Sequence, residues 1–248
     1  MSQVKWNVEH LDHVDSTNTW LAARARDGAD EGLAVYCDFQ SAGRGRRDRE
    51  WIAPAGSSLL CSVLLAPPVF LKAPQLFIVA AALSVCDALE QLTHVRPTLK
   101  WPNDVLFGDL KVAGLLAEVI PSETASKVVI GLGLNLIDVD PAFESATSVL
   151  SATGVALAPS RVLQVYLDEL GRRRELISTE EGLATLRQQY VAALSTIGCR
   201  VRVDLVDGQV RGRAVGVDET GALRVDTGSE VRTFTAGDVV HVRGEVEE

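Results

Sequence analysis

The chain has 248 residues, enough for one large domain or for a large domain followed by a small one. Hydrophobic residues make up 47% of it and charged residues 23%, which is ordinary for a globular protein. The formal net charge of −9 argues against a polyanion-binding protein, and 5% aromatic residues argue against a surface that stacks single-stranded bases. A local basic patch for a small phosphate ligand remains compatible with these values.

The amino-terminal residues 1–12 are polar and lack the apolar core of a signal peptide. The longest apolar stretch, residues 76–85, is shorter than a membrane-spanning helix requires. The four cysteines form no CxxC pair and have no histidine at metal-ligand spacing, so we expect buried free thiols. The sequence therefore predicts a cytoplasmic protein without a membrane anchor.

The apolar patterns predict a mixed order of strands and helices. Capping side chains at residues 15–18 precede a short helix that Gly28 closes. The elements predicted next are a strand over 33–39, a loop over 41–50, a strand over 58–65 that ends at Pro67-Pro68, a helix over 74–92, and strands over 99–107, 111–120 and 127–137. Amphipathic helices over 162–177 and 180–194 follow.

The composition changes near Ile197. Short alternating strands are predicted from there, at 201–205, 210–217, 222–225, 231–235 and 239–242, with glycine- or aspartate-containing turns between them. About five such strands in so short a segment predict a small β-barrel of the SH3-like kind. We therefore expect two domains, residues 1–196 and residues 197–248.

The segment GRGRRDREW, residues 43–51, places four guanidinium groups beside two glycines. Glycine lets the backbone approach a ligand closely and adopt positive φ, and guanidinium forks match phosphate and carboxylate oxygens. The missing third glycine argues against a dinucleotide fingerprint, and the segment is not a Walker loop. From these residues alone, an anion-binding loop and a solvated basic loop remain open.

Three later segments combine polar residues or glycines with apolar strands. KWPNDVLF, residues 100–107, suits either a plain turn or a site for a metal-phosphate or a ribose. KVAGLLAE, residues 111–118, begins with Lys111, which is either an edge gatekeeper or a cation facing a buried anion. Gly114 within it indicates a bulge or a close ligand approach, and GLGLN, residues 131–135, repeats that theme.

The order of these segments resembles that of the biotin protein ligase family. DSTN at 15–18, QSA at 40–42, GRGRRDREW, KWPND, KVAGLLAE, GLGLN and ATS at 146–148 follow one another as in that family. The motifs span residues 12–150, and the tail from Ile197 is similar to the family's SH3-like domain. Asp48 departs from the pattern, where a glycine is expected. Because little chain precedes Asp12, we expect none of the DNA-binding winged helix-turn-helix of the repressor members.

The resemblance implies an α+β fold, with a mixed, largely antiparallel sheet and flanking helices as in class II synthetases, followed by the barrel. It implies a ligase that uses ATP and Mg²⁺ to convert biotin into biotinyl-5′-AMP. The biotinyl group would then pass to a lysine of the biotin carboxyl carrier domain of an acyl-CoA carboxylase. A homodimer is compatible with this interpretation, and neither DNA nor a membrane is an expected partner.

The resemblance also implies roles for individual residues. Catalysis is expected of Lys111 and Arg46. The residues expected to bind biotin are Ser16, Thr17, Asn18, Gln40, Gly43, Arg44, Gly45, Arg46, Lys111 and Gly114. The residues expected to bind the nucleotide are Arg44, Arg46, Arg49, Trp51, Lys100, Asn103, Asp104 and Asn135, with Asp104 also expected to bind the metal.

Two alternative functions are weighed against biotin ligation, one with a different substrate and one in a different class of protein. An enzyme of the same superfamily that acts on lipoate or octanoate is the nearer one, although a long aliphatic acid does not need the polar set Ser16, Thr17 and Gln40. A nucleic-acid-binding module built on the basic loop and the barrel is the other. Charge opposes it, because residues 197–248 carry 7 Arg and no Lys against 10 Asp and Glu, a balance of −3.

Overall fold

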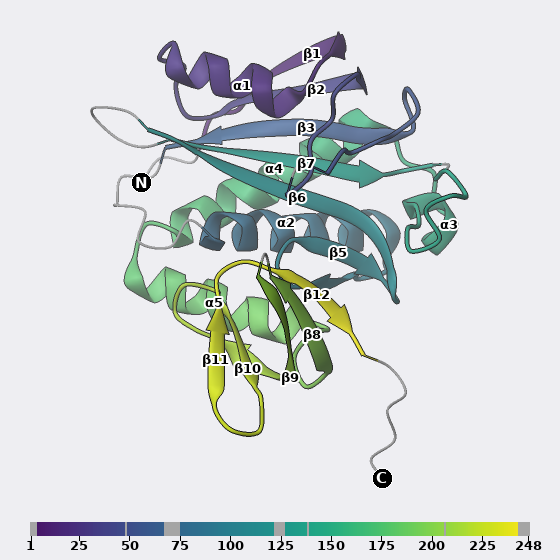
Figure 1. Cartoon of the computed structure of the whole chain (residues 1–248). Helices are drawn as coiled ribbons and strands as arrows, with labels where there is room; N and C mark the ends of the chain where they lie inside the picture. The colour runs from purple at the N-terminus through teal and green to yellow at the C-terminus, as the bar shows by residue number, and fades with distance from the viewer. Residues whose placement is uncertain are drawn as a thin grey trace.

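The computed structural model describes residues 4–47, 49–66, 75–121, 127–137, 139–205 and 207–242. Its main feature is a seven-stranded sheet with helices on both faces (Figure 1). The strands are β1 (Asn7–Val14), β2 (Leu33–Gln40), β3 (Ser58–Leu65), β4 (Thr98–Lys100), β5 (Asp104–Phe107), β6 (Leu110–Ile120) and β7 (Lys127–Asn135). Their order is β1-β2-β3-β7-β6-β5-β4, parallel between β1 and β2 and antiparallel elsewhere. The predicted mixed, largely antiparallel sheet is confirmed.

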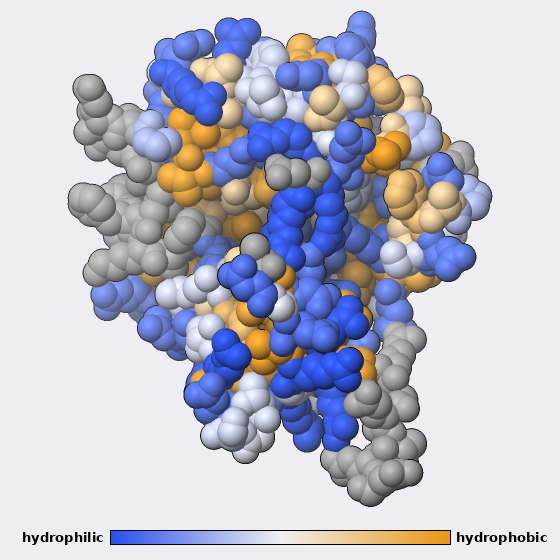
Figure 2. All heavy atoms as spheres, viewed as in Figure 1, coloured by the Kyte–Doolittle hydropathy of each residue, from blue (hydrophilic) through white to orange (hydrophobic). Residues whose placement is uncertain are grey.

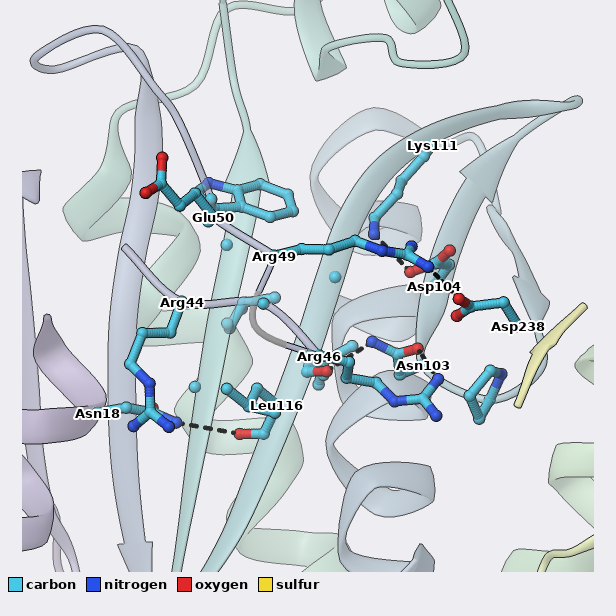
Figure 3. Close-up of a pocket in the computed structure, with 18 of the residues that line it drawn as sticks. Asn18, Arg44, Arg46, Arg49, Glu50, Asn103, Asp104, Lys111, Leu116 and Asp238 are labelled. Carbon is cyan, nitrogen blue, oxygen red and sulfur yellow. Dashed lines mark hydrogen bonds and ion pairs between the residues drawn. The ribbon is translucent and has the colours of Figure 1, made fainter. Parts of the chain in front are cut away.

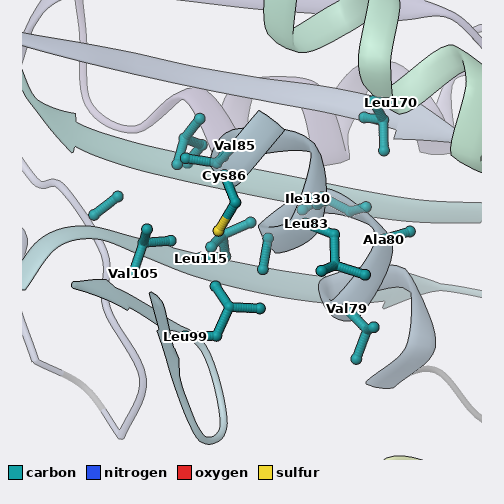
Figure 4. Packing of buried hydrophobic residues seen from close by; sticks show 14 of the residues in the cluster. Val79, Ala80, Leu83, Val85, Cys86, Leu99, Val105, Leu115, Ile130 and Leu170 are labelled. Atoms are coloured by element: carbon teal, nitrogen blue, oxygen red, sulfur yellow. The ribbon is translucent and has the colours of Figure 1, made fainter. Parts of the chain in front are cut away.

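Side chains alternate between the two faces of this sheet. On β3, Val63 packs into the cluster formed with α2 (Gln75–Thr93) and α4 (Pro159–Leu176), whereas Leu64 packs with residues of α1 (Thr17–Arg26). Successive strand residues point to opposite faces, so α2 and α4 cover one face and α1 covers part of the other. Figure 4 shows the packing on the α2 face.

Helix α2 is the centre of the apolar core. It has 19 residues with a mean hydropathy of 1.6, long and apolar enough to cross a membrane, and thus longer than the apolar stretch of residues 76–85 indicated. Inside the protein 72% of it is buried, between the sheet and the helices α4 and α5 (Glu180–Ala193). Each fully buried leucine there stabilises the fold by about 1.5–3 kcal/mol, which accounts for the apolar composition.

The carboxyl-terminal strands form a second, five-stranded antiparallel sheet of order β11-β10-β9-β8-β12. Its strands are β8 (Arg200–Leu205), β9 (Gly208–Val217), β10 (Leu223–Asp226), β11 (Val231–Phe234) and β12 (Asp238–His241). Val203 and Phe234 of this sheet belong to the same buried cluster as α2, and Trp101 donates its indole N–H to the Gly221 carbonyl at 3.1 Å. The domain boundary after residue 196 stays a prediction.

One prediction about the elements needs correction, and two elements were not predicted. The expected strand over 99–107 is two strands, β4 and β5, separated by a turn that contains a cis bond between Trp101 and Pro102. Strand β1 was not predicted because it is a mostly exposed edge strand without an apolar alternation. The short α3 (Val149–Thr153), between its cap Ser148 and Gly154, was also missed. Asp48, Pro67, Pro68 and Pro74 lie outside the described residues.

Candidate active site

A cavity of about 380 Å³ opens beside α1, where the large sheet faces the carboxyl-terminal sheet. Ligand sites commonly have this volume. Figure 2 shows hydrophilic side chains gathered where the two sheets approach each other. All predicted site residues except Gly43 and Asn135 line the cavity.

The floor of the cavity consists of glycines on β6 and β7. A Cβ atom at Gly131 would lie 2.2 Å from Oδ1 of Asn18, and one at Gly133 would lie 2.4 Å from the indole ring of Trp51. Real Cβ atoms do not approach this closely, so only glycine lets these two side chains lie flat against the sheet. The predicted close approach is therefore made by side chains of the protein itself.

One end of the cavity carries a connected set of polar groups. Oε1 of Gln40 accepts hydrogen bonds from the Thr17 backbone N–H at 2.8 Å and from its hydroxyl at 3.1 Å. Ser62 donates to Asn18 Oδ1 at 2.6 Å, and the Asn18 amide donates to Glu118 at 3.0 Å. All of these side chains are held in fixed orientations beside the glycine floor.

The expected capping role of residues 15–18 is wrong in part. Helix α1 begins at Thr17 after the N-cap Ser16, which makes no side-chain capping bond within the described part of the chain. Thr17 and Asn18 turn toward the sheet, where burial and hydrogen bonding to Gln40 and Ser62 replace a capping role.

The arginine-rich loop folds back over the cavity as a narrow hairpin. The Trp51 N–H donates to the Gly43 carbonyl at 3.0 Å, and a Cβ at Gly43 would lie 2.3 Å from the Trp51 carbonyl oxygen. Neither Gly43 nor Gly45 adopts the expected positive φ; Arg47 does, at 55°. Gly43 is therefore required because the two arms of the loop lie too close together for a side chain at this position. It faces Trp51 across the loop and does not line the cavity.

The arginines of the loop are paired with groups on both sides of the cavity (Figure 3). Arg44 lies 2.9 Å from Glu118 on β6. Arg46 donates to Asn103 at 3.2 Å and, through both terminal nitrogens, to the Gly237 carbonyl at 3.3 Å. Burial lowers the pKa of Arg46, and the negative charges of Asp238 and Asp104 oppose this shift.

Lys111 reaches the cavity because β6 contains an extra residue. Leu106 of β5 pairs with Lys111 and Val105 pairs with Ala113, so Val112 has no partner there and packs into the core on the α2 face. Lys111 thereby lies on the same face as Gly114. Strand β6 lies inside the sheet, which excludes the edge-gatekeeper interpretation of Lys111.

The Lys111 ammonium lies between a carboxylate and an aromatic ring. Its Nζ is 2.6 Å from Oδ1 of Asp104 and 5.5 Å from the centre of the Trp51 ring. A cation at this distance over an indole face is attracted by the ring. Both contacts hold the ammonium inside the cavity.

A second cavity of about 180 Å³ adjoins the first and shares Glu50, Trp51 and Lys111 with it. Asn135 lines this cavity, with its amide donating to the Thr147 carbonyl at 3.1 Å. The indole N–H of Trp51 is buried without a hydrogen-bond partner among the described residues. A buried unpaired donor indicates a place for a ligand acceptor. The candidate site thus has two chambers that meet at Trp51 and Lys111.

Few side chains in the described residues are placed to bind a metal ion together. Within the described ranges, one group of three potential ligands comes together, His10, Asp12 and Asp38, and all three are exposed on β1 and β2 away from both cavities. Asp104 is the predicted metal ligand and lies in the larger cavity. Mg²⁺ is commonly held by one or two carboxylates together with substrate phosphates, and this arrangement fits Asp104.

Several residues that line the cavity or hold its lining side chains were missed. Ser62 and Glu118 lie on the cavity face by the period-two pattern of β3 and β6, a signal that the sequence carries. Asp204 and Asp238 come from the carboxyl-terminal sheet, and no local pattern connects them with the loop, which precedes Asp238 by about 190 residues.

Comparisons with known proteins identify the family. Residues 11–135 match the Biotin/lipoate A/B protein ligase family, and residues 196–242 match the Biotin protein ligase C terminal domain. A Biotin–[acetyl-CoA-carboxylase] ligase of Mycobacterium tuberculosis is 40% identical over 92% of this chain and 86% of its own length. The chain belongs to the biotin protein ligase family. A ligase of the same name from Paracoccus denitrificans is 34% identical over 86% of this chain and 91% of its own.

The fold comparison agrees with biotin protein ligase membership. A biotin protein ligase from Aquifex aeolicus, solved in complex with biotin and ATP, has a TM-score of 0.82 and 28% identity, covering 96% of this chain and 99% of that one. The predicted family, fold class and ligase activity on biotin are confirmed.

Proposed function

We propose that this biotin protein ligase joins biotin and ATP into biotinyl-5′-AMP and then transfers the biotinyl group to one lysine of a biotin carboxyl carrier domain in an acyl-CoA carboxylase. The observation that carries the proposal is the meeting of two chambers at Lys111, one lined by a polar hydrogen-bonding set and the other by an indole and an amide. The carrier-domain part is supported by the acetyl-CoA-carboxylase named for two relatives.

The polar end of the larger cavity binds the ureido ring of biotin. That ring offers two N–H donors and one carbonyl acceptor, and Thr17, Asn18 and Gln40 supply both donors and acceptors there. Lipoate and octanoate have no such groups, so they would exclude water from this polar set without making hydrogen bonds to it. The polar set therefore favours biotin over either aliphatic acid.

The smaller cavity holds the purine of ATP. Trp51 offers a ring face and an unpaired N–H, and Asn135 presents a buried amide at the same chamber. The phosphates extend from there toward the larger cavity, where the cations are Arg44, Arg46, Arg49, Lys100 and Lys111. Guanidinium forks bind phosphate oxygens in pairs, which fixes the orientation of the chain of phosphates.

Charge screening is the main catalytic task, because both reactants are anions. A biotin carboxylate oxygen attacks the α-phosphorus, the bond to the bridging oxygen breaks, and pyrophosphate leaves. Lys111 and Arg46 both line the larger cavity, and in this proposal they stabilise the charge that develops where the carboxylate meets the α-phosphate. Asp104 would hold Mg²⁺ together with the substrate's phosphates, and the ion would supply further neutralisation of their charge.

The second step uses the same chamber. A neutral lysine amine of the carrier domain attacks the acyl carbon of the mixed anhydride, an amide forms, and AMP leaves. The arginine loop covers the cavity from one side and limits the access of water to the anhydride before the carrier domain arrives.

The experiment separates the two steps. Purified protein with biotin, ATP and Mg²⁺ is expected to release pyrophosphate without any carrier domain, and each omission abolishes the signal. Adding a purified carrier domain should give one biotin adduct by mass spectrometry, and a Lys→Arg variant of its acceptor lysine should give none. Pyrophosphate release that is no faster with biotin than without it, or that occurs equally with lipoate, would contradict the proposal.

The proposed setting is cytoplasmic, in line with free thiols at all four cysteines. A second copy of the chain is the other proposed partner, since β1 forms one edge of the seven-stranded sheet and an edge strand offers backbone hydrogen-bonding groups. Light scattering on the eluting protein, with and without biotin and ATP, tests this assembly, and a monomer mass in both conditions would exclude it.

A further inference from the structure

Three arginines of the loop converge on two consecutive residues of the carboxyl-terminal sheet. Arg47 donates to Oδ2 of Asp238 at 3.1 Å, and Arg49 pairs with the same oxygen. Arg46 donates through both terminal nitrogens to the carbonyl of Gly237, the residue before Asp238. Asp238 begins β12, so this contact joins the loop of one sheet to the first residue of a strand in the other.

A neighbouring carboxylate provides a contrast. Asp204 on β8 is the register partner of Asp238 and lines the same cavity. It is bound within its own strand by Arg202, through hydrogen bonds of 2.8 and 3.0 Å. The carboxylate of Asp238 is instead directed at Arg47 and Arg49 of the loop.

The loop has physical reasons to need such an anchor. It carries four arginines close together against only Asp48 and Glu50, and its excess of like charges repels itself until a further negative group lies beside it. Arg47 has a φ of 55°, a conformation that a residue with a Cβ atom rarely adopts. One carboxylate shared by two guanidinium groups relieves the repulsion and holds this turn in place.

We propose that Asp238 is a positioning residue that anchors the arginine loop over the cavity and so determines how long biotinyl-5′-AMP is retained. The inference rests on the proposed function. Arg46 is free to exchange the Gly237 carbonyl for a phosphate oxygen of the adenylate, while Arg47 and Arg49 remain on Asp238. Asp238 acts through these arginines and not on the reacting atoms.

Asp238→Asn keeps the shape of the side chain and removes its charge. Without ligand, amide hydrogen exchange at residues 43–47 and 49–51 should become faster, since the anchor is lost. With biotin, ATP and Mg²⁺, labelling of a bystander lysine-rich protein should rise about threefold to tenfold, the range for losing two partly exposed ion pairs. The maximal rate of pyrophosphate release should change by less than about twofold.

Two further variants serve as controls. Glu230→Gln also replaces a carboxylate by an amide, at an exposed residue just before β11 whose partner is Arg232, 3.9 Å away, and should leave hydrogen exchange and labelling unchanged. Asp238→Glu retains the negative charge and should restore most of the retention. If Asp238→Asn does not fold, which its thermal melting would show, the glutamate variant still tests the anchor through hydrogen exchange.

A double-mutant cycle decides whether the anchor is the mechanism. In protein that carries Arg47→Ala and Arg49→Ala, adding Asp238→Asn should produce no further rise in bystander labelling. An equal rise in both backgrounds, or no rise in the single variant, would overturn the inference. Wild-type protein is the reference throughout, and if it makes no adenylate, the proposed function fails. If wild type makes adenylate and Asp238→Asn retains it equally well, only the anchor fails.

Discussion

Lys111 and Asp104 form an ion pair on neighbouring strands of the large sheet, with Nζ and Oδ1 2.6 Å apart. The pair lies at the junction of the two chambers, with Trp51 on the other side of the ammonium. The ammonium is therefore held in place before any substrate binds, which reduces the reorganisation needed during the reaction. Oδ2 of Asp104 is left for a metal ion beside the position proposed for the ATP phosphates.

Lys111→Ala should lose adenylate synthesis itself. Removing a preorganised charge from the reacting centre typically lowers the rate about 10²- to 10³-fold, and pyrophosphate release with biotin, ATP and Mg²⁺ measures the loss. The matched control is Lys127→Ala, which removes a lysine that binds the Ala29 carbonyl at 2.6 Å far from both cavities. Synthesis within threefold of wild type in Lys111→Ala would remove the lysine from its proposed role.

Arg46→Gly should release adenylate more than it impairs synthesis. The guanidinium contacts Asn103 and Gly237 at the mouth of the cavity, and a hydrogen bond from a charged group to phosphate contributes about 1.5–3 kcal/mol. Bystander lysine labelling should therefore increase roughly tenfold or more. Arg161→Gly, at an exposed position of α4, is the comparison for a general loss of arginine. Unchanged labelling alongside normal synthesis would show that Arg46 does not retain the adenylate.

Gly133→Ala should weaken binding of both substrates, because the added methyl group meets the Trp51 ring at 2.4 Å and displaces it from both chambers. Calorimetric titration with biotin and with ATP measures the loss. Gly171→Ala is the control: in α4 its Cβ would meet one atom at 3.5 Å, and alanine in place of helical glycine stabilises by about 0.5–1 kcal/mol. Wild-type affinities in Gly133→Ala would mean that Trp51 does not shape the site.

The arginine loop should lose mobility when the adenylate forms. Ordering costs about 1–2 kcal/mol per residue, and contacts from Arg44 and Arg46 to ligand oxygens would have to supply it. Amide hydrogen exchange at residues 43–47 and 49–51 is expected to slow sharply on adding biotin and ATP together, with less change on adding biotin alone. Equal exchange with and without both ligands contradicts the prediction.

One thiol should react far faster than the other three. Burial, with a smaller effect of Asp38, raises the pKa of Cys37 to about 12, and burial raises the pKa of Cys86 to about 12. Burial and the neighbouring Cys37 raise the pKa of Cys61 still further. Little thiolate forms at these sites near pH 8, so a disulfide reagent should modify Cys199, which is half-buried, first. Mass mapping that finds Cys37 or Cys61 modified equally fast would refute this.

Most of the large sheet was predictable because its inner strands and covering helices carry strong apolar signals. Strand β3 and helix α5 begin at the expected residues, since a continuous apolar run marks the first and a cap at Thr179 the second. Most site residues were predictable as well, but through the order of the motifs and not through any local geometry. The ion-pair partners of the arginine loop were not predictable, because Asp238 and Glu118 come close to the loop only after the chain has folded.

The extra residue in β6 determines which face of the sheet Lys111 points to. From Gly114 onward, every second residue of β6 lies on the cavity side of the sheet. Lys111 also faces the cavity although it lies three residues before Gly114, because Val112 is the extra residue between them. If β6 paired with β5 without this bulge and kept all its residues, Lys111 would alternate with Gly114 and its ammonium would turn toward the helix-covered side of the sheet. The irregular pairing of β5 with β6 therefore decides which side of the sheet receives the cation, and the letters of the motif alone do not.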